Sequence, residues 1–193
     1  MWCALAAAAG AACEERKQPE GGDPPSRVNA SKTAARRGGG TESFCDALFP
    51  AGKGPALQWP EMSGGAASPS AMGRRWVNVW ATWCKPCLEE LPRLRAWHDR
   101  LTTAGKRFEL TFVSIDDSDA TIAEFRQLHP EAPPSMRVAD PTKNGAWFTQ
   151  LGLMDNPPIP LHIFTDPAGR IRCARAGAVQ EQDYDAIEKL LGE

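Results

Sequence analysis

The chain has 193 residues, of which 42% are hydrophobic and 24% are charged, and its formal net charge is -2. This length and apolar content suffice for one domain of ordinary size with its own core, and the small net charge gives no indication of a nucleic-acid partner. Six cysteines are too few for a disulfide scaffold at this length. The sequence contains no run of about 18 apolar residues, so no membrane-spanning helix is predicted.

The first 13 residues form a short apolar segment that ends at Cys13. Residues 1–12 resemble the apolar core of a secretory signal peptide, although no Lys or Arg precedes them. Cys13 follows Gly-Ala-Ala and resembles a lipoprotein processing site, at which it would carry lipid and become the mature N-terminus. The alternatives are a cleaved signal with an incidental cysteine and a cytoplasmic, alanine-rich start.

A linker is predicted for residues 14–43, which contain no aromatic residue, charges of both signs and three consecutive glycines. Such a segment cannot bury enough apolar surface to offset the entropy lost on ordering. If Cys13 carries lipid, the segment serves as a flexible tether. The composition changes at Phe44, so we expect the folded domain over residues 44–193.

Residues 74–92, RRWVNVWATWCKPCLEELP, organise the predicted domain. The bulky, β-favouring residues 76–80 predict a buried strand. Apolar side chains at helical spacing from Leu88 onward predict a helix, which Gly105 ends. A Cys-Lys-Pro-Cys motif lies between the two elements, and this layout places its first cysteine at the N-terminus of the helix.

The cysteines of this motif, Cys84 and Cys87, are the candidate catalytic residues. Free backbone N–H groups at a helix N-terminus, together with the neighbouring Lys85, stabilise a thiolate at Cys84 and lower the pKa of its thiol. Disulfide exchange needs such an accessible attacking thiolate and a second thiol that releases the mixed disulfide, a role that fits Cys87. Pro86 supplies no N–H and, with Lys85, tunes the redox poise.

Hydrophobic patterns along the remaining chain predict further strands, helices, a β-hairpin and a final helix. The predicted strands include residues 56–59, 108–116, 136–138, 161–164 and 171–176, and the predicted helices are residues 120–128, 144–151 and 181–191. The order is a βαβ half followed by a ββα half. Residues 117–158 between them are more numerous than a direct connection requires, so we expect an insertion there.

The string Trp-Ala-Thr-Trp-Cys-Lys-Pro-Cys over residues 80–87, followed by Glu90 and Pro92, resembles the TlpA/ResA branch of the thioredoxin-fold oxidoreductases. These are extracytoplasmic, membrane-tethered thiol–disulfide proteins, and the resemblance runs from about Phe44 to the end of the chain. It implies an α/β fold, the thioredoxin-like three-layer sandwich, in which helices flank a central mixed β-sheet. Insertions between the two halves are also found in that branch.

Glu90 lies three residues after Cys87, on the same face of the predicted helix. The TlpA/ResA branch carries a functional glutamate at this offset. The resemblance therefore implies that a half-buried Glu90 carboxylate moves a proton to or from the thiols and, when ionised, raises their pKa. The alternative is an ordinary surface glutamate beside Glu89.

Pro160 directly precedes the predicted strand 161–164. Thioredoxin-fold proteins have a cis-proline here, packed against the disulfide, which leaves the backbone of the preceding residue, here Ile159, free to pair with a substrate peptide. The family often shows Gly-Val-Pro-Thr where this chain has Pro-Ile-Pro-Leu, a departure that concerns substrate preference more than the fold. The alternative is a trans proline in a loop. Trp83, beside Cys84, is expected to add an apolar surface for substrate.

Cys45 and Cys173 are the two other cysteines of the predicted domain. One lies just before the first strand and the other on the last strand of the hairpin. In an oxidising compartment a structural disulfide between them is the economical pairing, and two inert buried thiols are the alternative. A zinc site on the Cys-x-x-Cys motif would need a second close pair, which these isolated cysteines do not supply.

The resemblance implies an enzyme, a protein-disulfide oxidoreductase that works as a periplasmic or extracytoplasmic monomer held at a membrane by its N-terminus. Reduced Cys84 attacks a disulfide in a protein substrate, and Cys87 resolves the mixed disulfide. The branch favours this reductive direction, with apocytochrome c or copper-site proteins as clients. A membrane electron donor, a thiol–disulfide transducer, would then recycle the enzyme.

Two other functions are compatible with the motif. A peroxiredoxin-like peroxidase uses an attacking cysteine preceded by a threonine, and Thr82 lies two residues before Cys84, although Trp83 and a resolving Cys87 argue against it. A non-enzymatic module that binds Cu(I) through Cys-x-x-Cys is the second alternative. No resident metal or other cofactor is predicted, because the histidines are scattered and suggest no Cys–His dyad: His98, His129 and His162.

Overall fold

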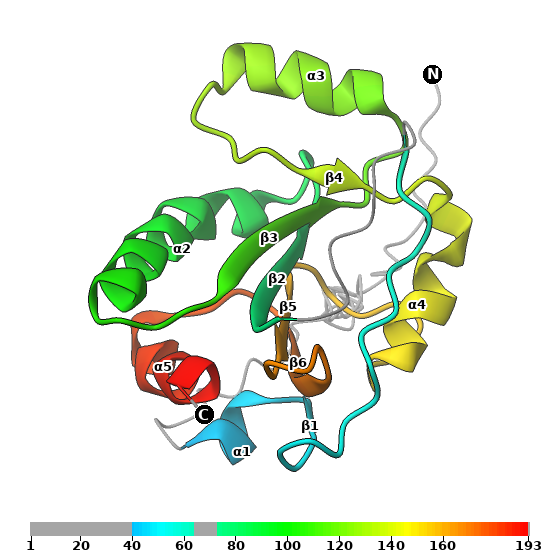
Figure 1. The fold of residues 1–193 in the computed structure, drawn as a ribbon. Helices are drawn as coiled ribbons and strands as arrows, with labels where there is room; N and C mark the ends of the chain where they lie inside the picture. Colours follow the sequence, from blue (N-terminus) through cyan, green and yellow to red (C-terminus); the bar gives the residue numbers. More distant parts are fainter. Residues whose placement is uncertain (1–39, 64–72, 193) are drawn as a thin grey trace, which may run out of the picture. The chain divides into compact units, whose positions relative to one another are not determined.

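The computed structural model describes residues 40–63 and 73–192 (Figure 1). The predicted signal segment over residues 1–13, with Cys13, lies outside the described residues, as does the predicted linker up to residue 39. Within the two described ranges, no helix has both the length and the apolar character needed to cross a membrane.

The first element, α1 (Thr41–Phe44), begins three residues before the predicted start of the domain. The N–H groups of Ser43 and Phe44 donate to the carbonyl oxygen of Gly40, which forms the turn. The Phe44 ring is buried and contacts Phe164 edge to face. The polar residues before Phe44 give no hydrophobic pattern from which this turn could be predicted, because Phe44 is the one residue of α1 that is buried.

The sheet has six strands in the order β1-β6-β5-β2-β3-β4. Its strands are β1 (Ala47–Leu48), β2 (Arg75–Trp80), β3 (Glu109–Ser114), β4 (Met136–Arg137), β5 (Leu161–Thr165) and β6 (Ile171–Ala176). β3 runs parallel to β2 and β4, whereas β5 is antiparallel to β2 and β6, and β1 is antiparallel to β6. β2 is therefore paired on both sides, and all of its residues are buried.

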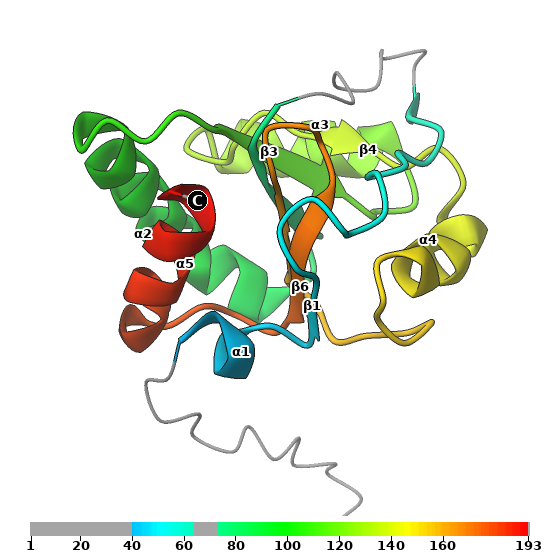
Figure 2. The same ribbon diagram turned by 60° about the horizontal axis from the view of Figure 1, so that its bottom comes forward.

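Helices cover both faces of this sheet. They are α2 (Lys85–Thr103), α3 (Asp119–Leu128), α4 (Asn144–Gln150) and α5 (Tyr184–Gly192), with short 3-10 turns at Pro141–Lys143 and Glu181–Asp183. Figures 1 and 2 show α2 and α5 together on one face and α4 on the other. The expected three-layer arrangement is confirmed, and α3, β4 and α4 form the expected insertion between the two halves.

The pleat of β2 separates two apolar cores, since successive side chains of a strand point to opposite faces. Trp76 and Trp80 belong to the core beneath α2 and α5. Val77 and Val79 belong to the opposite core, which includes side chains of α4. The register pairs Asn78 of β2 with His162 of β5, so both side chains lie on the α2 face.

The strand predicted at residues 56–59 is wrong. Only an isolated bridge between Ala56 and Arg170 forms there. Pro55 and Pro60 flank this segment, and a proline has no N–H to donate to a sheet. The edge of β6 is paired instead with β1.

Candidate active site

The Cys-x-x-Cys motif forms a disulfide at the N-terminus of α2. Cys84 is the N-cap of the helix, and its Sγ accepts the backbone N–H of Cys87 at 3.2 Å. The two Cα atoms are 5.2 Å apart. The Cys87 N–H at the helix end points at this sulfur, so a thiolate released there gains a hydrogen bond and favourable dipole interaction.

The disulfide is more enclosed than an accessible attacking thiol would suggest. Cys84 is only 4% exposed and Cys87 is fully buried. The exposed surface at this point is supplied by Trp83, which is 66% exposed, and by Lys85 and Pro86. A partner must therefore approach across the exposed ridge of residues that flanks Cys84.

Lys85 points away into solvent. Its Nζ lies 3.7 Å from Glu89 Oε1, and both side chains are largely exposed. Because this charge is screened by water and by its partner, Lys85 stabilises a Cys84 thiolate less than the helix N-terminus does.

The turn that carries Cys84 is held by Asp116, which the sequence analysis did not single out. Asp116 follows β3 and is fully buried. Its carboxylate accepts the backbone N–H of Thr82 at 3.1 and 3.2 Å, the Thr82 hydroxyl at 2.7 Å and the Ser114 hydroxyl at 2.7 Å. The sequence does contain a sign of this role. Asp116 follows the carboxyl end of β3, and the carboxyl ends of the parallel strands β2 and β3 lie at the same edge of the sheet.

Pro160 forms the expected cis peptide bond and lies directly before a strand. The Ile159–Pro160 peptide bond is cis, and Pro160 directly precedes β5. The register pairs Val79 near the end of β2 with Leu161 at the start of β5. The cis bond therefore lies at the sheet edge from which the chain turns toward Cys84.

Glu90 is 1% exposed, not half-buried as expected, whereas Glu89 beside it is exposed. Its Oε1 accepts Asn78 Nδ2 at 2.9 Å and its Oε2 accepts the backbone N–H of Val179 at 2.9 Å. His162 Nε2 lies 3.3 Å from Oε2. Glu90 is therefore a buried carboxylate one helical turn beyond Cys87, surrounded by donors.

His162 is the second residue that the sequence analysis left without a role. Nothing in its sequence spacing relates it to Glu90, and only the pairing of β5 with β2 brings it to the α2 face. Throughout the described part of the chain, no group of three or more His, Cys, Asp or Glu side chains is placed to hold a metal ion.

Cys45 and Cys173 form a second disulfide, with Cα atoms 5.5 Å apart. It joins the segment between α1 and β1 to the middle of β6. Both cysteines are buried in the same core as Cys84 and Cys87. This bond closes a loop of the chain that contains most of the described residues.

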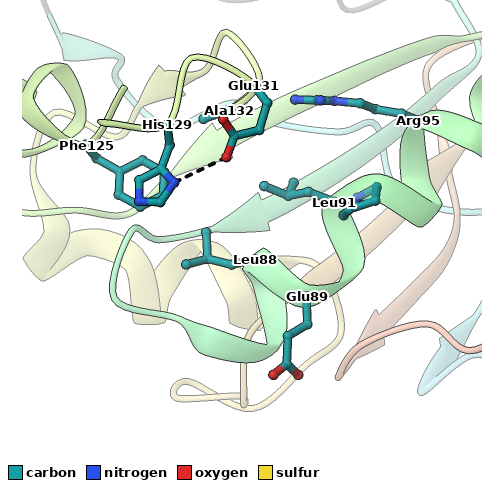
Figure 3. Close-up of a pocket in the computed structure, with 9 residues that line it drawn as sticks. Leu88, Glu89, Leu91, Arg95, Phe125, His129, Glu131 and Ala132 are labelled. Carbon is teal, nitrogen blue, oxygen red and sulfur yellow. Dashed lines mark hydrogen bonds and ion pairs between the residues drawn. The ribbon is translucent and has the colours of Figure 1, made fainter. Parts of the chain in front are cut away.

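A pocket of about 310 Å³ lies beside the motif helix, and Figure 3 shows its lining. Leu88, which directly follows Cys87, and Leu91 provide an apolar floor from α2. His129 stacks on Phe125 with ring centres 4.3 Å apart and lies 3.2 Å from a Glu131 oxygen. The pocket suits an apolar side chain with a polar neighbour.

Glu131 forms the charged rim of this pocket. A hydrogen bond to its own backbone N–H, aided by one to His129, lowers the pKa of Glu131 from its ordinary value. Glu131 therefore stays ionised at neutral pH, and Arg95 in the same lining carries the opposite charge.

Comparisons with known proteins agree with this geometry. The model of a family described as thioredoxin-like matches residues 75–171, which is half of the chain. A crystal structure of a protein described as the thiol:disulfide interchange protein DsbE of Chlorobium tepidum superposes with a TM-score of 0.54 at 20% identity, covering 75% of this chain and 96% of that one. The chain belongs to the thioredoxin-like family, and its expected fold class is confirmed.

Two curated relatives are similar in sequence. A thiol:disulfide interchange protein DsbE homolog of Paracoccus denitrificans is 30% identical over 112 residues, which are 58% of this chain and 55% of that protein. The thiol-disulfide oxidoreductase ResA of Bacillus thuringiensis is 25% identical over 116 residues, 60% of each protein. The matched region thus spans somewhat more than half of each relative.

Proposed function

We propose that this protein is a thiol–disulfide oxidoreductase that exchanges its Cys84–Cys87 pair with protein substrates. The disulfide at the N-terminus of α2 is the observation that carries this proposal. Its support from outside the chain is the likeness to relatives named as thiol:disulfide interchange protein and thiol-disulfide oxidoreductase.

The reaction proceeds in two exchanges. The reduced Cys84 thiolate attacks one sulfur of a substrate disulfide, forms a mixed disulfide and releases the other substrate sulfur as a thiolate. The Cys87 thiolate then attacks Cys84 Sγ and releases the second substrate thiolate. Two electrons pass from the Cys84–Cys87 dithiol to the substrate, and two protons restore its thiols.

Substrate contact is assigned to the surface around the cis bond. The half-buried Ile159 precedes cis-Pro160 at the sheet edge next to the motif. A substrate peptide lying there in extended form pairs with the Ile159 backbone. Trp83, with 66% of its surface exposed, offers an apolar face beside Cys84.

The direction and place of action rest on the resemblance to the TlpA/ResA branch. We propose that the protein acts as a reductant outside the cytoplasm, with lipid at Cys13 as its membrane tether and a membrane thiol–disulfide transducer as its electron donor. Apocytochrome c, in the course of cytochrome c maturation, is the proposed client. The Cys45–Cys173 disulfide supports an oxidising location, because structural disulfides persist there.

Reduction of insulin by the dithiothreitol-recycled protein tests the activity. The wild-type protein accelerates it, and Cys84→Ser abolishes the acceleration. Cys87→Ser retains the first exchange and accumulates a mixed disulfide, which is visible on a non-reducing gel. Turnover that persists in Cys84→Ser would refute the assignment of Cys84.

The midpoint potential of the pair tests the direction separately. A reductant equilibrates with reference buffers near thioredoxin, at about -270 mV, whereas a strong oxidant lies near about -120 mV. A value at the oxidising end would reverse the proposed direction while leaving the exchange chemistry intact.

A further inference from the structure

The carboxylate of Glu90 has a histidine beside it whose protonation is set by a third residue. Trp76 Nε1 donates to His162 Nδ1 at 3.1 Å, and His162 is fully buried. An indole nitrogen only donates, so Nδ1 must be the accepting nitrogen. The proton of a neutral imidazole is then on Nε2, the nitrogen 3.3 Å from Glu90 Oε2.

Glu90 therefore faces donors from three separate elements. Asn78 on β2 and Val179, in the loop after β6, donate hydrogen bonds, while Nε2–H of His162 on β5 lies close by. Within the described residues His162 Nε2 has no aligned hydrogen-bond partner, so this contact can tighten onto a charged carboxylate.

Two arginines on the adjoining elements have partners other than Glu90. Arg175, which pairs with His162 across β5 and β6, lies 3.4 Å from Asp183 and over the Phe44 ring. Arg93, one turn after Glu90 on α2, donates to the Val179 carbonyl oxygen at 2.9 Å and fixes the loop that covers Glu90. The groups that contact the Glu90 carboxylate are Asn78, Val179 and His162.

We propose that His162, held as its Nε2–H tautomer by Trp76, is a positioning residue that orients the Glu90 carboxylate as the proton acceptor for the Cys87 thiol. The inference rests on the proposed function. The Cys87 proton passes to Glu90, the sulfur electron pair forms the bond to Cys84, and the substrate sulfur leaves with the electrons of the broken mixed disulfide. Glu90 then returns the proton, through solvent, to the departing thiolate.

Asn78 allows both protonation states of Glu90 to keep a partner. Its Nδ2 donates to the carboxylate, and its Oδ1 has no hydrogen-bond partner in the described part of the chain. An amide that turns over presents this oxygen to the O–H of a protonated Glu90. The same buried site therefore accepts a proton and gives it back without leaving a polar group of Glu90 unpaired.

The test compares His162→Leu, which removes the donor, with His162→Gln, which retains an N–H donor and an acceptor for Trp76. In His162→Leu the exchange of the reduced protein with oxidised glutathione loses about tenfold in its Cys87-dependent step at pH 7. The midpoint of the pH–rate profile of that step rises, because the carboxylate has lost a donor that faces its charged form. His162→Gln restores most of the rate, and the Glu90→Gln background removes the effect of His162→Leu.

Alkylation of the reduced protein by iodoacetamide provides a readout that needs no substrate. The rate at Cys84 changes less than about twofold in His162→Leu, whereas the pH profile at Cys87 shifts. Equal changes at both cysteines, an unshifted Cys87 profile, or effects that add to those of Glu90→Gln would overturn the proposal. If His162→Leu shifts the Cys87 profile but the wild-type protein does not reduce insulin, the proposed function fails, and only the effect of His162 on the Cys87 thiol is retained.

Imidazole nitrogen shifts of the wild-type protein give a check that requires no variant. His162 is expected as the Nε2–H tautomer, because Trp76 Nε1 donates to its Nδ1. A proton on Nδ1 would overturn the assignment, because Trp76 could not donate to that nitrogen.

Discussion

Cys84–Cys87 and Cys45–Cys173 belong to the same core and are similarly hidden from solvent. The first cysteine of each pair is 4% and 7% exposed, and the second is fully buried in both. They differ in separation along the chain, which is 3 residues for one pair and 128 for the other. Solvent exposure therefore does not distinguish an exchangeable disulfide from a structural one in this molecule.

The surroundings of the sulfur atoms make the distinction. Cys84 Sγ already accepts an N–H at the end of a helix, so a thiolate that leaves there is stabilised. Cys173 lies inside β6, between β1 and β5, where the backbone N–H groups serve the sheet. A thiolate at Cys173 would be buried without such donors, which disfavours the charged form.

The largest expected effect comes from removing the long-range disulfide. Cys45→Ala with Cys173→Ala lowers the free energy of unfolding by about 4 kcal/mol, because the unfolded chain regains the freedom that a loop of more than a hundred residues had lost. Urea unfolding followed by tryptophan fluorescence measures it. The matched pair Cys84→Ser with Cys87→Ser has a smaller effect, since its loop is short. Equal losses would contradict this contrast.

Graded reduction sharpens the comparison kinetically. In dilute dithiothreitol we expect the Cys84–Cys87 bond to open about 100-fold faster than Cys45–Cys173, since its leaving thiolate is stabilised. Alkylation at timed intervals followed by mass spectrometry counts the thiols of each pair. Opening of both pairs at one rate would mean that the helix N-terminus does not set the difference.

Asp116→Asn tests the anchoring of the turn before Cys84. The neutral amide cannot reproduce the hydrogen bonds from Thr82 and Ser114 to a buried carboxylate, so we expect a loss of about 2 kcal/mol in unfolding free energy. The neighbouring Asp117 is exposed, and Asp117→Asn serves as a control with an effect below about 0.5 kcal/mol. Similar losses for both variants would deny Asp116 this role.

The smallest expected effect concerns the ion pair between Arg137 and the exposed Asp119. A hydrogen bond from Arg137, aided by Ser63, holds the pKa of Asp119 below its ordinary value. This stabilisation is present above the ordinary aspartate pKa of about 3.9 and disappears as pH falls through the lowered one. At neutral pH Asp119→Asn therefore costs at most about 0.5 kcal/mol, since exposed pairs contribute little. An undiminished cost in urea unfolding at pH 2 would contradict this cause.

Local pattern sufficed for the elements whose signal lies in adjacent residues. The apolar run of β2, the motif and the spacing of α2 predicted a strand, a turn and a helix, and Gly105 ends the helix with a positive φ of 84°. The same reasoning failed at residues 56–59, where an apolar run is held by neighbouring prolines in an irregular path. The strand that pairs with the edge of β6 is β1, and its two residues are too few to show an alternating hydrophobic pattern.

The candidate site was predicted as far as it follows the motif, and no further. Cys84, Cys87 and Glu90 share one helix, so their proximity follows from helical spacing. His162 and Asp116 come from other strands, and their places depend on register and on which strand ends meet. The depth of Glu90 was also out of reach, because the covering Val179 belongs to a loop near the end of the chain.

The pairing of β1 with β6 makes folding of the newly synthesised chain depend on formation of a disulfide. Only two residues of β1 pair with the edge of β6, and the adjacent Cys45–Cys173 disulfide holds β1 in this position. In a newly made chain with free thiols β1 would pair with β6 only weakly. The unpaired backbone of β6 could then form hydrogen bonds with strands of other molecules. Formation of the Cys45–Cys173 disulfide is thus the last step of folding. Chains that are kept in a reducing environment should aggregate before they reach the native state.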